Sequence, residues 1–221
     1  MKTLKLTESD FKIIDGKKTY IGAENISDFI GNLEIDENLG IVFFKKDLKV
    51  SGYILAKAGS GIKAGLGIKA GWGIEADWGI DAGWGIDAGL GIDAGWGIDA
   101  DWGIDAGLGI KAGLGIKAGD GITAGLGIKA GDGIEAGDGI EAGLSIFCKK
   151  TLSSNLRIFA GTCLHKIPEL QETQIVCGKL EKGQIAYGIL VETGIEEEKK
   201  DCISGKKVLI DGKEYVLNEV R

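Results

Sequence analysis

Gly61-Ile-Lys-Ala-Gly-Leu66 and Gly67-Ile-Lys-Ala-Gly-Trp72 open a run of six-residue units that continues to Ser145-Ile146. Isoleucine occupies every sixth position from Ile62 to Ile146, and alanine follows two positions behind it from Ala64 to Ala142. A strict short period is the sequence signature of a repeat architecture. The run therefore decides the fold, and the remaining segments have to be interpreted around it.

Each unit alternates in the manner of a β-strand. The isoleucine, the alanine and one variable residue take every second position, and a charged residue and two glycines lie between them, which is a period of two rather than 3.6. Two glycines in six residues would also destabilise a helix, by about 1 kcal/mol each relative to alanine. Gly-x-Gly suits a tight corner that requires a positive φ or a close backbone approach. We therefore expect an all-β fold, a parallel β-solenoid with an interior of Ile and Ala.

The number of sides per coil follows less directly from the period. A six-residue side is about 20 Å long, and stacked coils lie about 4.8 Å apart. We expect a triangular coil of about 18 residues, with a flat two-sided coil of about 12 as the alternative. The unit resembles that of the hexapeptide-repeat left-handed β-helix family, aliphatic-x-x-x-small-x. In that family the small residue precedes the aliphatic one, whereas Ala64 follows Ile62, so the handedness stays open.

Three regions are expected along the chain. Residues 1–43 form an N-terminal β cap, in which Asp15-Gly16 turns a hairpin between two alternating apolar runs. Residues 44–164 form the solenoid, whose end units are degenerate, as terminal repeats usually are. Residues 165–221 form a small C-terminal β domain. Within these regions we expect strands at 26–30, 33–35, 41–44, 174–178 and 185–191. Two more strands are expected within 207–217, joined by a second hairpin turn at Asp211-Gly212. A linker or short helix is expected at 162–174 and a loop at 196–201.

Composition limits the class of protein. The 221 residues include 39 glycines, yet the hydrophobic fraction of 44% is too high for a disordered chain. The net charge of −7 disfavours direct binding to nucleic acid or to an anionic membrane. No stretch resembles a signal peptide or a membrane span. The four cysteines include no Cys-x-x-Cys pair, so we expect reduced thiols, no metal site and a cytoplasmic location.

Catalytic residues are not evident. Hexapeptide-repeat β-helices are often acyltransferases that use a histidine base, but His165 lies outside the regular units and has no recognisable partner motif. Cys148 falls in the alanine phase of the repeat and is expected in the interior. A single histidine and no motif around any cysteine make a thiol nucleophile a poor candidate. We predict a protein that is not an enzyme and that has no cofactor.

The variable slot of the repeat holds all five tryptophans. It also holds aspartates, and an unpaired buried carboxylate is too costly for an interior position, so the slot is expected at the outward corner. In a triangular coil the slots form three ridges. One ridge is apolar throughout and is a candidate for self-association: Trp72, Leu90, Leu108, Leu126 and Leu144.

In the charged slot, the residues between Gly73 and Leu108 are acidic, and the residues on either side are mostly lysine. We call the acidic stretch between Gly73 and Leu108 the acidic belt. Exposed tryptophans beside a field of one sign are unusual on an inert surface. The belt could be a solvated face, a site for a hard cation, or a surface that binds a partner with a basic groove, with Trp as the anchor type common at interfaces. The candidate partner-binding residues are Trp78, Trp84, Trp96, Trp102, Asp81, Asp87, Asp93, Asp99, Asp101 and Asp105.

The Gly-Ile-x-Ala-Gly-x run with a β-rich tail also resembles repeat proteins encoded by bacteriophages and other mobile elements. That resemblance implies a non-enzymatic binding protein, with an inhibitor of a host defence nuclease (anti-CRISPR-like) as the example that fits an acidic belt. The alternative it implies is a self-assembling structural protein, such as a phage spike, fibre or lattice component. The expected partner is therefore a protein with a basic groove, or the chain itself as a homo-oligomer.

Overall fold

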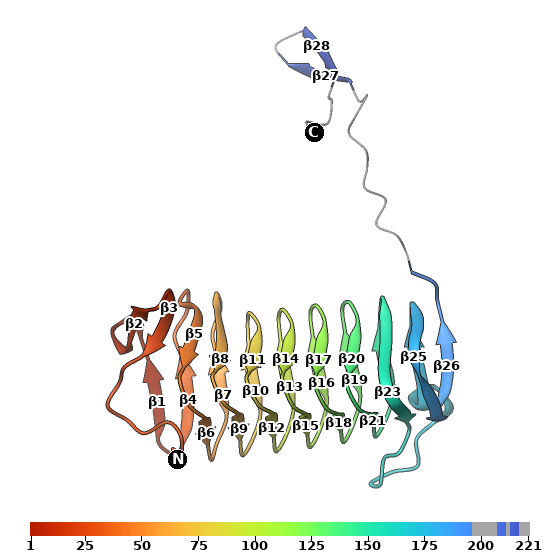
Figure 1. Ribbon diagram of the computed structural model, residues 1–221, viewed down its shortest axis with the longest axis horizontal. Coiled ribbons are helices and arrows are strands. Elements are labelled where there is room, and N and C mark those ends of the chain that lie inside the picture. Colours follow the sequence, from red (N-terminus) through yellow and green to blue (C-terminus); the bar gives the residue numbers. More distant parts are fainter. Residues whose placement is uncertain (196–206, 211–212, 217–221) are drawn as a thin grey trace.

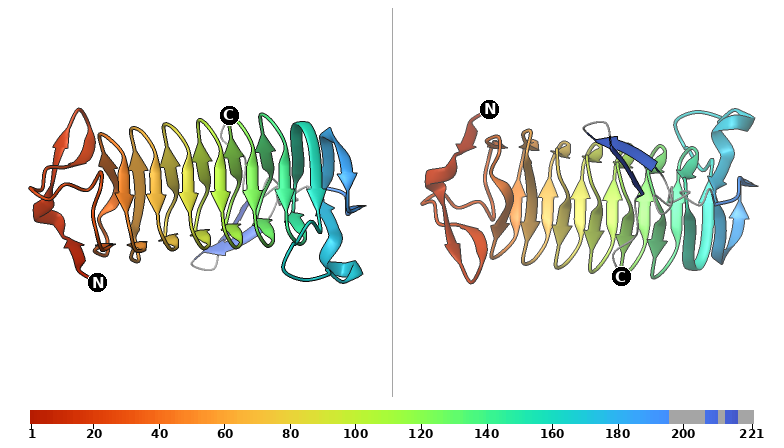
Figure 2. Two further views of the ribbon diagram at one scale, coloured as in Figure 1. Left: turned by 90° about the horizontal axis from the view of Figure 1, so that it is seen from below. Right: turned by 90° about the horizontal axis from the view of Figure 1, so that it is seen from above.

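The computed structural model describes residues 1–195, 207–210 and 213–216. Residues 1–195 form a straight stack of coils with three flat sides, seen from one side in Figure 1 and from two others in Figure 2. Each regular coil takes 18 residues. Strand pairing places Asp81 beside Lys63 of the preceding coil and beside Asp99 of the next coil, and each of these residues is 18 positions away. The triangular β-solenoid is therefore confirmed, and the two-sided coil of about 12 residues is excluded.

The strands form three faces, which we call A, B and C in chain order. Face A contains β1 (Thr3–Leu6), β4 (Asn32–Ile35), β7 (Ile54–Ala56), β10 (Ile74–Ala76), β13 (Ile92–Ala94), β16 (Ile110–Ala112), β19 (Ile128–Ala130), β22 (Ile146–Cys148), β24 (Gln174–Cys177) and β26 (Ile189–Glu192). Face B contains β2 (Phe11–Ile14), β3 (Lys17–Tyr20), β5 (Gly40–Phe44), β8 (Ser60–Ala64), β11 (Ile80–Ala82), β14 (Ile98–Ala100), β17 (Ile116–Ala118) and β20 (Ile134–Ala136). Face C contains β6 (Leu48–Val50), β9 (Ile68–Ala70), β12 (Ile86–Ala88), β15 (Ile104–Ala106), β18 (Ile122–Ala124) and β21 (Ile140–Ala142).

The core is a ladder of identical side chains. In each unit the isoleucine and the alanine point inward and are buried, whereas the residue between them points outward. Ile74, for example, lies between Ile54 and Ile92 of the adjacent coils. Because every inward residue meets its own kind one coil away, apolar burial and dispersion contacts repeat along the whole stack. The inward pattern therefore fixes the architecture without using the charged or the variable slot.

Close backbone approach favours glycine at the first position of each corner, although Asp77 and Asp101 occupy this position at two of the corners. None of the corner glycines of the regular units has a positive φ. A Cβ on Gly113 would overlap with the carbonyl oxygen of Gly95 in the preceding coil, whereas a Cβ on Gly115 would lie 3.4 Å from the nearest oxygen. The first glycine thus lets successive coils stack at the corner, and the second is less constrained.

The N-terminal end of the stack is closed by a hairpin. Strands β2 and β3 pair antiparallel, and both turn residues, Asp15 and Gly16, have positive φ values of 51° and 74°, as a type I′ turn requires. The predicted hairpin is confirmed. Phe11, Tyr20 and Phe44 pack with ring centroids 5.7–6.2 Å apart over this end of the core. The 3-10 helix η1 (Glu8–Asp10) leads into the hairpin.

Two expectations for this region are wrong. Residues 26–30 do not form a strand, because only Phe29 pairs, through a single bridge to Val50. Ala58 lies six positions before Ala64, so the six-residue period predicts that it points inward, but it is exposed. Ile54 pairs with Ile74, 20 positions on, whereas regular partners are 18 apart, so this coil has two additional residues and Ala58 lies in that insertion.

The stack continues past residue 164. The long strand β23 (Thr151–Ala160) turns from face B to face C, pairing first with β20 and then with β21. After a loop that contains the 3-10 helix η2 (Leu170–Thr173), β24 and β26 add two more strands to face A, and β25 (Lys179–Tyr187) pairs with β23. Residues 174–192 therefore stack in parallel on the coils before them, as β4 and β5 do at the other end.

The last described strands, β27 (Lys207–Ile210) and β28 (Lys213–Val216), form an antiparallel pair. Their pairing agrees with a hairpin at this point, although the turn residues Asp211-Gly212 lie outside the described residues. The expected loop at 196–201 and Cys202 also lie outside them.

Candidate functional site

The variable slots lie on the three edges of the prism, as the sequence predicts. Backbone hydrogen bonds join each slot residue to the slot one coil away, for example Trp96 N–H to the Trp78 carbonyl. The edge between faces A and B carries Trp78, Trp96, Leu114 and Asp132; the edge between B and C carries Leu66, Trp84, Trp102, Asp120 and Asp138; and the edge between C and A carries Trp72, Leu90, Leu108, Leu126 and Leu144.

The four candidate tryptophans do not form one cluster. They form two stacked pairs on different edges: Trp78 with Trp96 at 4.6 Å between ring centroids and 8° between planes, and Trp84 with Trp102 at 5.1 Å and 3°. The ring spacing equals the spacing of the coils. Because each indole is covered on one ring face by its partner, each pair presents a ridge of ring edges. Trp84, Trp96 and Trp102 are 41–53% exposed.

The acidic belt is likewise divided among the faces. Asp81 and Asp99 are neighbours on face B, Asp87 and Asp105 are neighbours on face C, and Asp93 lies on face A. The tenth candidate, Asp101, replaces the first corner glycine on the edge between B and C, next to Trp102. Asp77 does the same beside Trp78, and its carboxylate accepts a 2.7 Å hydrogen bond from the Gly59 N–H in the coil with the insertion.

Some acids of the belt are neutralised by a nearby lysine, which the order of residues along the chain does not indicate directly. Three of them form ion pairs with a lysine of the adjacent coil: Lys63 with Asp81, Lys69 with Asp87 and Lys111 with Asp93. Reading the charged slot at intervals of 18 rather than six residues identifies these counter-ions from the sequence. The belt is therefore not a uniform ring of negative charge.

Five acids of the belt have no ion pair within the described residues: Glu75, Asp77, Asp99, Asp101 and Asp105. Burial raises the pKa of the Asp99 carboxyl, and the adjacent Asp81 carboxylate raises it further. Burial and then the Asp87 carboxylate raise the pKa of Asp105 in the same way. In both cases the neighbouring acid already has its own lysine. Asp99 and Asp105 are thus the acids of the belt with the most to gain from an external cation.

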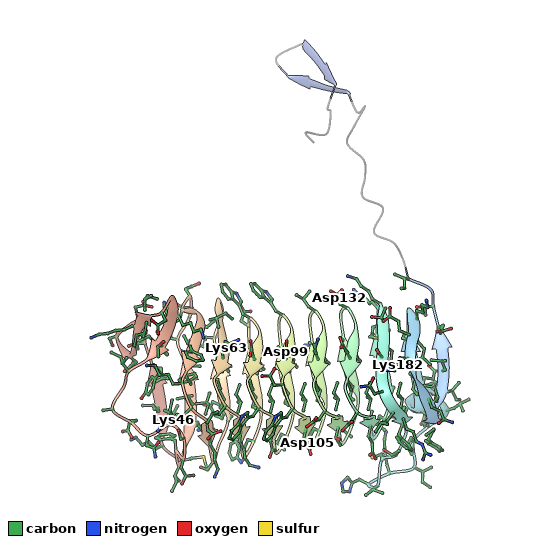
Figure 3. All side chains as sticks on the ribbon, viewed as in Figure 1. Lys46, Lys63, Asp99, Asp105, Asp132 and Lys182 are labelled. Carbon is green, nitrogen blue, oxygen red and sulfur yellow. The ribbon has the colours of Figure 1, made fainter. Side chains whose placement is uncertain are left out.

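Face B combines these features. It is the face whose two edges both carry a stacked Trp pair, and Asp81 and Asp99 lie between those edges. In Figure 3, Lys63 and Asp99 lie along this face, Asp132 lies at its upper margin and Asp105 lies below it. The face is therefore a band of charge bounded by two aromatic ridges.

A shallow groove runs along face B, parallel to the solenoid axis. Its volume is about 790 Å³. A row of second corner glycines, such as Gly97, forms the floor, Trp96 and Leu114 line one side, and the outward charged row lines the other. Faces A and C have equivalent grooves of about 740 and 610 Å³. The glycine floors follow directly from the Gly-x-Gly corners.

Within the described residues, the thiols and the histidine are not brought together by hydrogen bonds. Cys148 is buried at the predicted interior position, where burial and then the nearby Cys177 raise the pKa of its thiol to about 12. Burial also raises the pKa of the Cys177 thiol. His165 is exposed in the loop before η2, lining a small hollow with Cys163 and Glu141. No hydrogen bond joins these three side chains, and the described residues contain no group of acids, His and Cys arranged to hold a metal ion.

The helical segments within the described residues are two short 3-10 turns, and none is long and apolar enough to cross a membrane. We compared the chain with models of protein families, with curated proteins and with solved structures. No family model, no curated protein and no solved structure matches it.

Proposed function

We propose that this protein is a non-enzymatic binding protein that engages a protein partner through face B. The observation that carries the proposal is the placement of Asp81 and Asp99 between two stacked tryptophan pairs. Trp is enriched among the residues that dominate interface energies, because it buries a large apolar area at a low cost in side-chain entropy. The two aromatic ridges would contact the partner on either side of the carboxylates.

The charges of the face favour a basic partner. Asp99 has no ion pair within the described residues, and Asp77 and Asp101 add negative charge at the two edges beside Trp78 and Trp102. A cation of the partner placed at Asp99 would offset the repulsion from Asp81. Complementary charge of this kind speeds encounter and selects partners, and it is weakened by salt.

We further propose that the partner surface is a basic groove of the kind that holds nucleic acid. On face B the adjacent carboxylates of Asp81 and Asp99 make a short run of negative charge at the coil spacing, between Lys63 and Lys117, and a phosphate backbone also presents negative charges in line. Together with the resemblance to proteins of phages and mobile elements, this favours an inhibitor of a host nuclease as the specific function. The net charge of −7 supports binding to the nuclease rather than to its nucleic acid.

The test is capture of a partner from bacterial host lysate, at low and high salt, with the wild-type chain and two variants. Trp84→Ala with Trp102→Ala removes one aromatic ridge of face B, and Leu108→Ala, on the opposite edge, is the matched control. The wild type and the control should retain the same protein at low salt and lose it at high salt, and the double variant should not retain it. Purified partner should then lose nucleic-acid binding when the wild-type chain is added. Equal capture by the double variant would contradict the proposal.

A second candidate function is structural self-association through the edge between faces C and A. Its supporting observation is that the ridge stays apolar through five successive coils, with Trp72, Leu90 and Leu108 at 43–49% exposure. Light scattering should then show a defined oligomer that Leu108→Glu disrupts. A monomer at every concentration would exclude this function.

A further inference from the structure

The outward row of face A has a self-complementary order that extends over more coils than on the other faces. Strand register places the outward side chains of face A in line along the axis, one per coil, and six successive ones lie between Glu34 and Val176. Their order is apolar, acidic, acidic, basic, basic, apolar: Leu55, Glu75, Asp93, Lys111, Lys129 and Phe147. Reversing the row and exchanging the sign of each charge gives the same row again. A surface with this property is complementary to a second copy of itself.

Two charges of the row have no ion pair among the described residues. The two central residues, Asp93 and Lys111, form an ion pair at 2.7 Å. The next residues outward, Glu75 and Lys129, have no ion pair within the described residues; Lys129 lies over the Phe147 ring instead, 5.7 Å from its centroid. These two opposite charges are equally far from the centre of the row. Glu75 of one copy is therefore available to pair with Lys129 of a second copy, and Lys129 with Glu75 of that copy.

A two-fold axis that is parallel to the strands and midway between β13 and β16 places the two ends of the row opposite each other in the two copies. It packs face A on face A with the two solenoids antiparallel. Glu75 then lies opposite Lys129 of the second copy, and Leu55 opposite its Phe147. A two-fold axis along the solenoid would instead place each charge opposite itself, which is repulsive. The charges thus select one of the two symmetric ways to pack this face.

The apolar edge between faces C and A falls in the same interface. The two-fold axis keeps the strand direction, so this edge of one copy lies beside the same edge of the other. Leu90 comes level with Leu108 of the second copy, and Trp72 with its Leu126. The groove on face A, which Leu55, Leu108 and Phe147 help to line, would be closed by the contact. Six coils of about 4.8 Å and a side of about 20 Å give roughly 1,200 Å² buried in total, the lower end for a specific dimer.

The other faces do not offer an equivalent surface. On face B, a two-fold axis between Asp81 and Asp99 would oppose like charges throughout. Face C has a shorter complementary row, Lys49, Lys69, Asp87 and Asp105, but Lys49 already pairs with Asp28, and Lys69 with Asp87. We propose that the protein forms an antiparallel two-fold dimer through face A, with Glu75 and Lys129 as the charge pair that sets its register. This surface is separate from face B, and it includes the edge between faces C and A on which the second candidate function, self-association, rests.

Charge exchange tests the dimer, with molar mass measured by size-exclusion chromatography and light scattering over a range of concentrations. The wild type should be a dimer. Glu75→Lys alone, or Lys129→Glu alone, places two like-charge contacts in each dimer and should weaken association on the order of 100-fold or more. The double variant Glu75→Lys with Lys129→Glu should restore the dimer. An equimolar mixture of the two single variants should form a heterodimer, because every contact is then complementary.

The controls separate this surface from the others. Asp105→Lys on face C should leave the dimer intact, as should Trp84→Ala with Trp102→Ala on face B, so loss of partner binding and loss of dimerisation are distinguishable. Circular dichroism checks that each variant is folded. The proposal is overturned by a wild type that stays monomeric, by single variants that dimerise like the wild type, or by a folded double variant that fails to dimerise.

Discussion

Faces A and B are built from the same six-residue unit and share one core, yet they present different surfaces. Face A carries blocks of opposite charge between two apolar ends, beside an apolar edge, whereas face B carries adjacent carboxylates between two stacked tryptophan pairs. Neither difference alters an inward residue. The comparison teaches that a hexapeptide solenoid separates the residues that set the fold from those that set recognition, because strand alternation sends them to opposite sides of the sheet.

The largest expected effect tests whether the two faces share their core. Ile92→Ala beneath face A and Ile98→Ala beneath face B each remove a fully buried side chain from an identical ladder. Each should lower the free energy of unfolding by about 3 kcal/mol, as measured by denaturant titration. Because the surroundings repeat, the two values should agree to within about 1 kcal/mol. A larger disagreement would mean that the faces are not energetically equivalent inside.

A smaller effect should distinguish the edges. In a double-mutant cycle, Trp84→Ala and Trp102→Ala should show a coupling of about 1 kcal/mol in unfolding free energy, because the two indoles stack. Trp84→Ala and Trp96→Ala, on different edges, serve as the matched control and should be additive. Equal coupling in both cycles would indicate that the tryptophans interact around the coil rather than along it.

The smallest effect concerns the unpaired carboxylate of face B. The raised pKa of Asp99 means that the folded chain binds a proton more tightly than the unfolded chain does, so the wild type loses stability as pH rises from the ordinary carboxylate range through the raised pKa. Asp99→Asn removes this cost. At neutral pH the variant should be more stable by less than about 1 kcal/mol, since the site is exposed and screened.

That advantage should fade as the pH is lowered below the ordinary carboxylate range, where both states are protonated. Thermal unfolding of the wild type and of Asp99→Asn across this range measures the difference. A constant difference at all pH values would contradict the assigned cause, repulsion from Asp81 together with burial.

The sequence predicted the parts of the molecule that depend on local alternation. The Asp15-Gly16 hairpin, the inward Ile and Ala, the outward corner slot and the buried Cys148 all follow from neighbours within a few residues, and the structure confirms each. The strand expected at 26–30 was wrong because an apolar run does not reveal whether a neighbouring strand is in register to pair with it, and only Phe29 finds a partner. The ion pair of Lys111 with Asp93 required knowledge of the coil length.

The six-residue period by itself determined that the chain forms a solenoid, and which side chains enter the core, because alternation along a strand is a local property. Only the tertiary structure decided that a coil has three sides. A two-sided coil would have stacked Trp84 on Trp96, whereas the triangular coil stacks Trp78 on Trp96 and Trp84 on Trp102. The three-sided coil stacks residues 18 positions apart, because each strand pairs with the strand one full turn away. It thereby decides which outward residues meet on each face.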